Sequence, residues 1–80
     1  MTEKPLTELA AGEEGVIVAL HGGKGLESRL RALGLVEGQS VRVCSCVNWG
    51  GPVIVSINRA QVAVGRGMAR KILVRAADDE

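Results

Sequence analysis

Residues 15–35 read Gly-Val-Ile-Val-Ala-Leu-His-Gly-Gly-Lys-Gly-Leu-Glu-Ser-Arg-Leu-Arg-Ala-Leu-Gly-Leu, and the order of elements in this stretch decides the fold. Its first six residues, 15–20, are rich in β-branched side chains, which favour a pleated strand. Three glycines interrupt residues 21–25 and indicate a flexible connection. The stretch therefore begins with a short strand that ends in a turn.

A helix is expected after this connection. Leu26, Leu30 and Leu33 recur at i, i+4 and i+7, which places them on one face of a helix. Gly34 stands where helices commonly end on a left-handed residue, and Leu35 stands where the Schellman motif makes its apolar contact. We expect the leucine face to pack mainly on the core, with a groove beside it as a docking site.

The second half of the chain reads as a series of short strands. Residues 40–47 alternate between valine and polar or cysteine side chains, and this period of two indicates a half-buried strand. Residues 53–57, 60–64 and 71–75 are further apolar segments separated by turn-forming residues. Residues 65–69 predict a tight turn or a single helical turn.

About five short strands with one helix inserted after the first predict a mainly β fold, a small and strongly curved antiparallel barrel. A flat sheet of this size would leave one face and two edges open to solvent. The position of the helix favours an SH3-like barrel. In the alternative, an OB-type barrel, the helix usually falls between the third and fourth strands.

The composition fits one small globular domain. The chain has 80 residues, of which 46% are hydrophobic and 24% charged, with a formal net charge of +1. We expect one domain over 1–80, with an ordered body over about 5–75 and an acidic tail over 76–80. The longest apolar run, 16–20, is too short to span a bilayer, and the first residues lack the pattern of a secretory signal. A cytoplasmic protein without direct membrane insertion follows.

The charges are distributed unevenly along the chain. No carboxylate occurs between Glu37 and Asp78, whereas six arginine or lysine residues lie in that interval. The favoured interpretation is a solvated barrel surface, and the alternative is a basic face for nucleic acid or for an acidic protein partner. Because Trp49 is the one aromatic residue on which a base could stack, a nucleic-acid-binding barrel is the weakest hypothesis, and we expect no nucleic-acid partner.

The residues that support catalysis are missing from the expected body. His21 is the single histidine, and the two aspartates, Asp78 and Asp79, lie in the tail, so no Ser-His-Asp arrangement can be assembled there. Lys24 follows a glycine but lacks the remaining residues of a phosphate-binding loop. We therefore expect a protein that is not an enzyme.

Cys44 and Cys46 are the residues that raise the question of a metal site. In a regular strand both thiols project from the same face, where they could meet one Fe²⁺ or Zn²⁺ ion. A closed site needs four ligands, and His21 is the best third candidate. The favoured interpretation is that both cysteines fill space, so no cofactor is required, and metal binding through these three residues is the alternative function.

Trp49 is expected at the tip of a hairpin, between Asn48 and two glycines. A large apolar side chain at this place either anchors a partner protein or folds back over the mouth of the barrel. The sequence supports both interpretations equally.

With these residues laid out, the chain resembles the FeoA family of small ferrous-iron transport accessory proteins over most of 6–74. The resemblance is carried by three segments: Leu6-x-x-Leu9-x-x-Gly12-x-x-Gly15, Gly25-Leu26-x-x-Arg29-Leu30-x-x-Leu33-Gly34-Leu35-x-x-Gly38, and Val62-Ala63-Val64-Gly65-Arg66-Gly67-Met68-Ala69-x-x-Ile72-x-Val74. The Cys44-x-Cys46 pair lies outside these segments.

The resemblance implies an SH3-like fold and a cytosolic, non-enzymatic interaction module. Its implied partner is FeoB, the membrane transporter of Fe²⁺, whose uptake activity it would regulate. On this hypothesis the apolar and basic residues of the helix, together with the hairpin tryptophan, make the contact. These residues are Leu26, Arg29, Leu30, Arg31 and Trp49.

Overall fold

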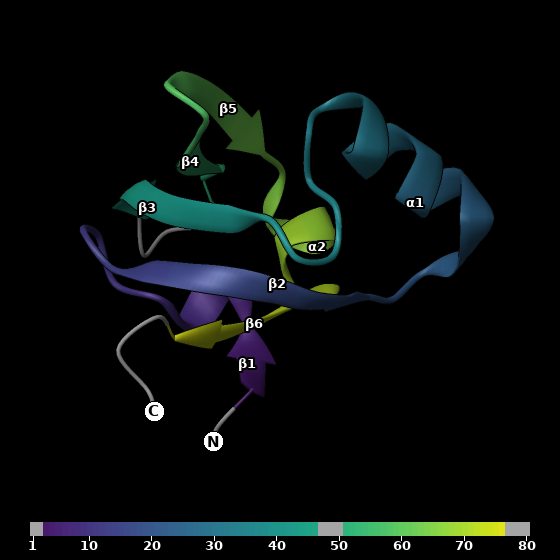
Figure 1. Ribbon diagram of the computed structural model, residues 1–80, viewed down its shortest axis with the longest axis horizontal. Helices are drawn as coiled ribbons and strands as arrows, with labels where there is room; N and C mark the ends of the chain where they lie inside the picture. The colour runs from purple at the N-terminus through teal and green to yellow at the C-terminus, as the bar shows by residue number, and fades with distance from the viewer. Residues whose placement is uncertain (1–2, 47–50, 77–80) are drawn as a thin grey trace.

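A computed structural model describes residues 3–46 and 51–76. Figure 1 shows a small curved sheet with one longer and one shorter helix. The elements in chain order are β1 (Glu3–Pro5), the 3-10 turn η1 (Leu6–Glu8), β2 (Glu14–Leu20), α1 (Gly23–Ala32), β3 (Ser40–Cys46), β4 (Val53–Ile57), β5 (Ala60–Val64), α2 (Arg66–Ala69) and β6 (Ile72–Ala76).

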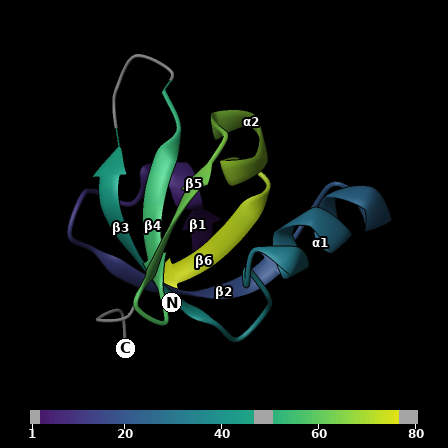
Figure 2. The ribbon, with the colours of Figure 1, turned by 90° about the horizontal axis from the view of Figure 1, so that it is seen from above.

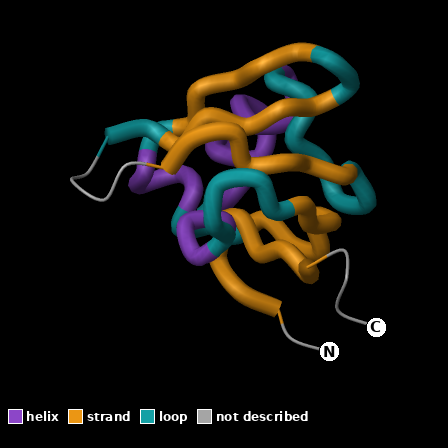
Figure 3. The backbone as a smooth tube through the Cα atoms, turned by 90° about the vertical axis from the view of Figure 1, so that its left-hand side faces the viewer, coloured by secondary structure: helices purple, strands orange, loops and turns teal. Residues whose placement is uncertain are grey.

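The strands form one antiparallel sheet in the order β1-β6-β2-β3-β4-β5. The backbone trace in Figure 3 shows how strongly this sheet curls. The mainly β character expected from the sequence is confirmed. Two details differ: the sheet has six strands rather than about five, and it is not closed, because β1 and β5 remain as its two edges.

The additional strand is β1. The helix therefore follows the second strand in chain order and not, as was expected, the first. Glu3, Lys4 and Pro5 are polar or unfavourable in a strand, so no apolar pattern marks them. They pair with Arg75, Val74 and Leu73 of β6. Proline is tolerated here because an edge strand needs no N–H donor on its open side.

Over 3–46 and 51–76, the buried core inside the curled sheet is entirely aliphatic. η1 and the residue after it close the sheet at one end with the buried side chains of Leu6 and Leu9. No buried polar or charged residue occurs among the residues that the structure describes. The core consists of Leu6, Leu9, Ile17, Leu30, Leu35, Val41, Val43, Val53, Val55, Ile57, Val64, Ala69, Ile72 and Val74.

The C-terminal end of α1 forms the expected Schellman motif. Gly34 has a left-handed backbone with φ of 91°. The N–H of Leu35 donates to the carbonyl of Leu30 at 2.8 Å, and the N–H of Gly34 donates to that of Arg31 at 3.0 Å. Leu30 and Leu35 are both fully buried, so the motif supplies the apolar contact that accompanies it. The helix begins at Gly23, three residues before the expected start.

β4 and β5 are joined by a short hairpin loop. Ile57 pairs with Ala60, which leaves Asn58 and Arg59 as a two-residue loop. Both loop residues have positive φ, 50° and 73°. This is the type I′ turn, whose twist matches that of the strands it joins.

No helix of the described chain is long and apolar enough to cross a membrane, and α1 has ten residues.

A glycine-to-alanine pair tests the turn after α1. Gly34→Ala places a side chain on a residue with φ of 91°, and we expect a loss of about 1 kcal/mol in the free energy of unfolding. Gly25→Ala is the matched control, because Gly25 lies within α1 and an added Cβ meets nothing within 4 Å. The control should leave the protein equally stable or more stable, by up to about 1 kcal/mol. Urea unfolding measures both, and equal losses would contradict the assignment.

Candidate functional site

α1 is attached to the body along one side only. Leu30 is fully buried, Leu26 is half-buried, and Leu33 is 39% exposed. Figure 2 shows the helix projecting from the end of β2, away from the other strands. The expectation that the leucine face packs mainly on the core therefore needs correction at Leu33. The chain turns at Gly34, so the next leucine, Leu35, enters the core in its place.

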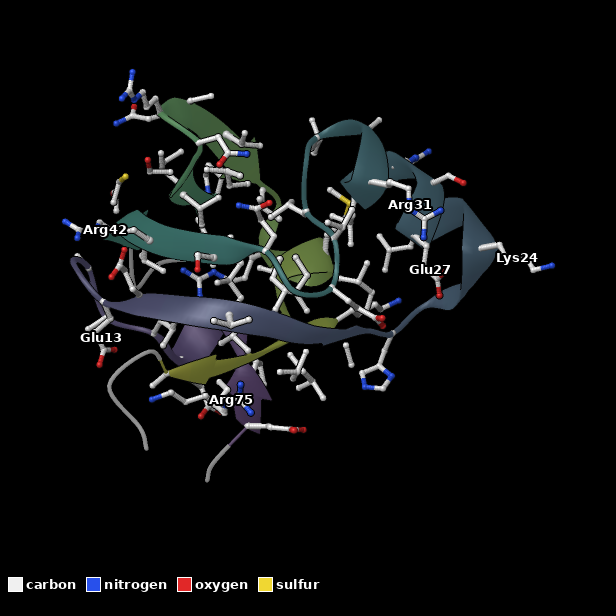
Figure 4. The ribbon with its side chains drawn as sticks, viewed as in Figure 1. Glu13, Lys24, Glu27, Arg31, Arg42 and Arg75 are labelled. Atoms are coloured by element: carbon white, nitrogen blue, oxygen red, sulfur yellow. The ribbon has the colours of Figure 1, made fainter. Side chains whose placement is uncertain are left out.

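The exposed side of α1 combines apolar and basic side chains. Arg29 and Arg31 are exposed, and Lys24 lies near the start of the helix. Arg29 precedes Leu33 by four residues, a spacing that puts neighbouring side chains on one face of a helix. Figure 4 shows Arg31 and Lys24 on α1, at the opposite end of the molecule from Arg42.

Four of the five residues expected to contact a partner are thus on one helix, Leu26, Arg29, Leu30 and Arg31. Leu30 faces the core, so it positions the helix rather than offering a contact. Leu33 was missed as a contact residue because its spacing matches that of its buried neighbours. The only signal was its place immediately before the helix-ending glycine. Trp49, the fifth residue, lies outside the described residues, and its role stays a prediction.

His21 lies at the junction between β2 and α1. Its N–H donates to the carbonyl of Lys71 at 2.8 Å, and its side chain is exposed. The next residue, Gly22, has φ of 121°, and its backbone lies directly against the side chains of Leu26 and Lys71. A side chain at residue 22 would collide with Leu26, so glycine is required at this junction.

Cys44 lies at a β-bulge of β3, near the start of β2 and therefore far from His21. The pairing of β3 with β4 shifts by one residue between Val43 and Ser45, so Cys44 has no direct partner on β4. Its thiol is half-buried, 3.9 Å from the Gln61 Nε2 that donates to it and 3.9 Å from the Arg42 carbonyl. The bulge interrupts the strict alternation from which a shared face with Cys46 was expected. The side chain of Cys46 lies outside the described residues.

The structure does not bring His21 to Cys44. Glu14 of β2 pairs with Arg42, next to the bulge, whereas His21 follows the far end of β2. At about 3.3 Å per residue, the length of β2 separates the two by roughly 20 Å along the strand. Over 3–46 and 51–76, no group of three His, Cys, Asp or Glu residues is placed to hold a metal ion.

Arg42 and Glu14 form an ion pair on the surface of the sheet. The guanidinium and carboxylate are 3.6 Å apart, and the side chains are 57% and 50% exposed. An exposed pair of this kind contributes at most about 1 kcal/mol to stability. It is a feature of the solvated surface rather than of a binding site.

The element order, the leucines of α1 and the glycine turn that ends it can now be compared with known proteins. The FeoA domain family matches residues 4–76. This chain belongs to the FeoA domain family. The match includes every helix and strand except the first residue of β1.

Two relatives support the assignment. "Putative Fe(2+) transport protein A" of Methanocaldococcus jannaschii is 36% identical over 74 residues, which are 92% of this chain and 88% of the relative. The crystal structure of an iron uptake regulatory protein (FeoA) has a TM-score of 0.89 and 31% identity, and the match covers 94% of this chain and 99% of that one. The SH3-like fold class expected from the sequence is thereby confirmed.

A manganese-dependent transcriptional repressor shares the fold as part of a larger chain. The TM-score is 0.84 at 20% identity, and the match covers 92% of this chain but 41% of the repressor. The similarity therefore concerns the architecture of this small sheet alone.

Two leucine substitutions distinguish the buried from the exposed side of α1. Leu30→Ala removes a fully buried side chain and should lower the free energy of unfolding by about 2–5 kcal/mol. Leu33→Ala removes a side chain that is 39% exposed and should cost less than about 1 kcal/mol. Thermal unfolding of the two variants makes the comparison, and a larger loss for Leu33→Ala would contradict the placement of α1.

Proposed function

We propose that this protein is an accessory protein of ferrous iron uptake that acts in the cytoplasm by contacting the Fe²⁺ transporter FeoB through α1. The observation that carries the proposal is the exposed face of α1, where Leu33 and part of Leu26 lie beside Arg29 on a helix that projects from the body. Membership of the FeoA family and the name of the M. jannaschii relative support the connection to Fe²⁺ transport.

The chemistry of this face suits a protein partner. Apolar side chains in the middle of a contact supply affinity when water is excluded from them. Arginines at the margin attract carboxylates and set the orientation of the partner. Because Leu30 and the turn at Gly34 hold the helix, Arg29 and Leu33 are presented without a large ordering cost on binding.

Regulation by contact rather than catalysis is the proposed mode of action. In the described part of the chain, the exposed His21 and the partly buried Cys44 are far apart, and no three His, Cys, Asp or Glu side chains gather in one place. Fe²⁺ enters this proposal as the cargo of the transporter. The accessory protein would alter uptake by binding FeoB.

A titration tests the proposal. The ¹⁵N-labelled protein is mixed with the cytosolic part of FeoB, and amide shifts are expected at Arg29, Arg31 and Leu33. The double variant Arg29→Gln with Arg31→Gln should bind at least about threefold more weakly, because each exposed ion pair contributes a few tenths to 1 kcal/mol.

Arg42→Gln is a control for the loss of a positive charge elsewhere, since it removes one arginine at the opposite end of the molecule. Its affinity for FeoB should equal that of the unchanged protein. The proposal fails if the α1 amides do not shift at saturating FeoB, or if Arg42→Gln weakens binding as much as the double variant does.

A further inference from the structure

The two edges of the sheet differ in how they are protected. β1 carries Glu3 and Lys4 and ends at Pro5, and charges and proline are common devices that keep an edge strand from pairing with another chain. β5 reads Ala-Gln-Val-Ala-Val, with neither a charge nor a proline. It pairs with β4 without a register shift, and Figure 1 shows it as the last strand of the stack. β5 is therefore a regular edge strand that lacks these devices.

Two residues of β5 direct their backbone groups away from β4. The two-residue loop makes Ile57 and Ala60 a pair that exchanges both hydrogen bonds, and such pairs alternate along an antiparallel ladder. Every second residue of β5 from Ala60 onward therefore bonds to β4. The N–H and C=O of Gln61 and Ala63 point the other way, toward the open edge, and an added strand would bond to them.

This edge is complementary to a second copy of itself. When two β5 strands run antiparallel with Val62 opposite Val62 of the second copy, Gln61 of each strand faces Ala63 of the other. Each facing pair then exchanges both of its hydrogen bonds, which uses every outward backbone group of these two residues. The pairing has two-fold symmetry, and its axis passes between the two Val62 residues.

Neighbouring registers use the edge less well. Sliding one strand by two residues brings either Arg59 or Gly65 into the new ladder. Arg59 belongs to the turn and has φ of 73°, so it is not extended. The carbonyl of Gly65 already accepts a hydrogen bond from the N–H of Ala69 in α2 at 2.8 Å. The register centred on Val62 is therefore the favoured one.

The side chains of β5 fit this register on both faces of the sheet. On one face the long side chain of Gln61 lies beside the methyl group of Ala63, and both residues are exposed in the single chain. On the other face the two Val62 side chains meet, and β-branched pairs across neighbouring strands are favourable. Val62 is half-buried against the core, so the second copy covers its remaining surface.

The charges favour a second copy over a charged partner. β5 itself is uncharged, so no like charges oppose each other within the paired strands and nothing there selects an acidic or basic segment. The exposed Arg59 stands opposite Gly65 of the second copy, which has no side chain. The formal net charge of the chain is +1, so two copies repel each other only weakly.

We propose that this protein forms a two-fold symmetric dimer in which the β5 strands of two copies pair antiparallel around Val62 and join the two sheets into one. Association stops at two chains, because only the β1 edges remain and these carry charges and proline. The contact is small, so the dimer is weak and its population rises with protein concentration. This surface is separate from α1 and does not rest on the contact with FeoB.

The mass of the protein in solution provides the first test. Sedimentation equilibrium is measured from micromolar to millimolar protein, with and without a reducing agent. We expect the average mass to rise from that of one chain toward that of two and no further, equally under both conditions. Added salt should not weaken the dimer, because no attraction between opposite charges holds it.

Nuclear magnetic resonance tests the register. Hydrogen exchange at Gln61 and Ala63 should slow as the protein concentration rises. A mixture of ¹³C-labelled and unlabelled protein should give a cross-peak between the Hα atoms of Val62 in the two copies. Such a contact is expected because residues between the hydrogen-bonded pairs have the closest Cα atoms of an antiparallel ladder.

Variants of the edge separate backbone from side chain. Ala63→Pro removes an outward N–H and leaves the β4 ladder intact, so the fold should remain while the dimer weakens by about tenfold or more. Gln61→Lys and Gln61→Glu each place like charges diagonally across the axis and should weaken it by about two- to fivefold. An equal mixture of these two variants should restore pairing, since opposite charges then meet.

Ser45→Lys is the matched control for Gln61→Lys. Ser45 is exposed on β3, an inner strand of the sheet, so the same charge is added away from the open edge. This variant should form the dimer as the unchanged protein does.

Any of five results would overturn the proposal. They are the mass of one chain at millimolar protein, a dimer that forms only without the reducing agent, a dimer that Gln61→Lys leaves intact, a mixture of the two charged variants that pairs no better than either alone, and binding of the capped peptide Thr-Val-Thr-Val-Thr to β5 of a chain that stays monomeric. If Ala63→Pro fails to fold, the Gln61 variants and their mixture still decide the outcome.

Discussion

The left-handed turn at Gly34 determines how α1 is held. It brings the N–H of Leu35 onto the carbonyl of Leu30 and directs both side chains into the core, where they are fully buried. Without it, Leu35 would leave the interior and the helix would lose its C-terminal attachment. The turn also lies against β4, since a Cβ at this position would come within 3.8 Å of the Ile57 side chain. One backbone conformation therefore joins the helix, the connection after it and the sheet.

The proposed contact surface at α1 follows from what the small core leaves uncovered. A sheet that curls without closing keeps two edges, and a helix fixed through Leu30 keeps most of its circumference in solvent. The proposed contact at α1 therefore needs no rearrangement of the core.

The sequence predicted those parts of the fold that periodicity and turn chemistry encode. The helix, its glycine stop and most of the strands were recognised because their apolar residues repeat at 3.6 or 2 residues. β1 was missed, since Glu3-Lys4-Pro5 is stabilised by pairing with β6 and not by an apolar pattern of its own. The bulge at Cys44 and the exposure of Leu33 depend on contacts between distant segments, which no local pattern records. His21 and Cys44 looked compatible as ligands because spacing along the chain carries no information about separation across a sheet.

The aliphatic core of the described residues has a spectroscopic consequence. Valine, leucine and isoleucine are transparent in the near ultraviolet, and the chain contains neither tyrosine nor phenylalanine. Its whole intrinsic fluorescence comes from Trp49, in the connection between β3 and β4. Emission changes therefore report the surroundings of this one side chain, whereas the packing of the described aliphatic core can be followed through methyl resonances.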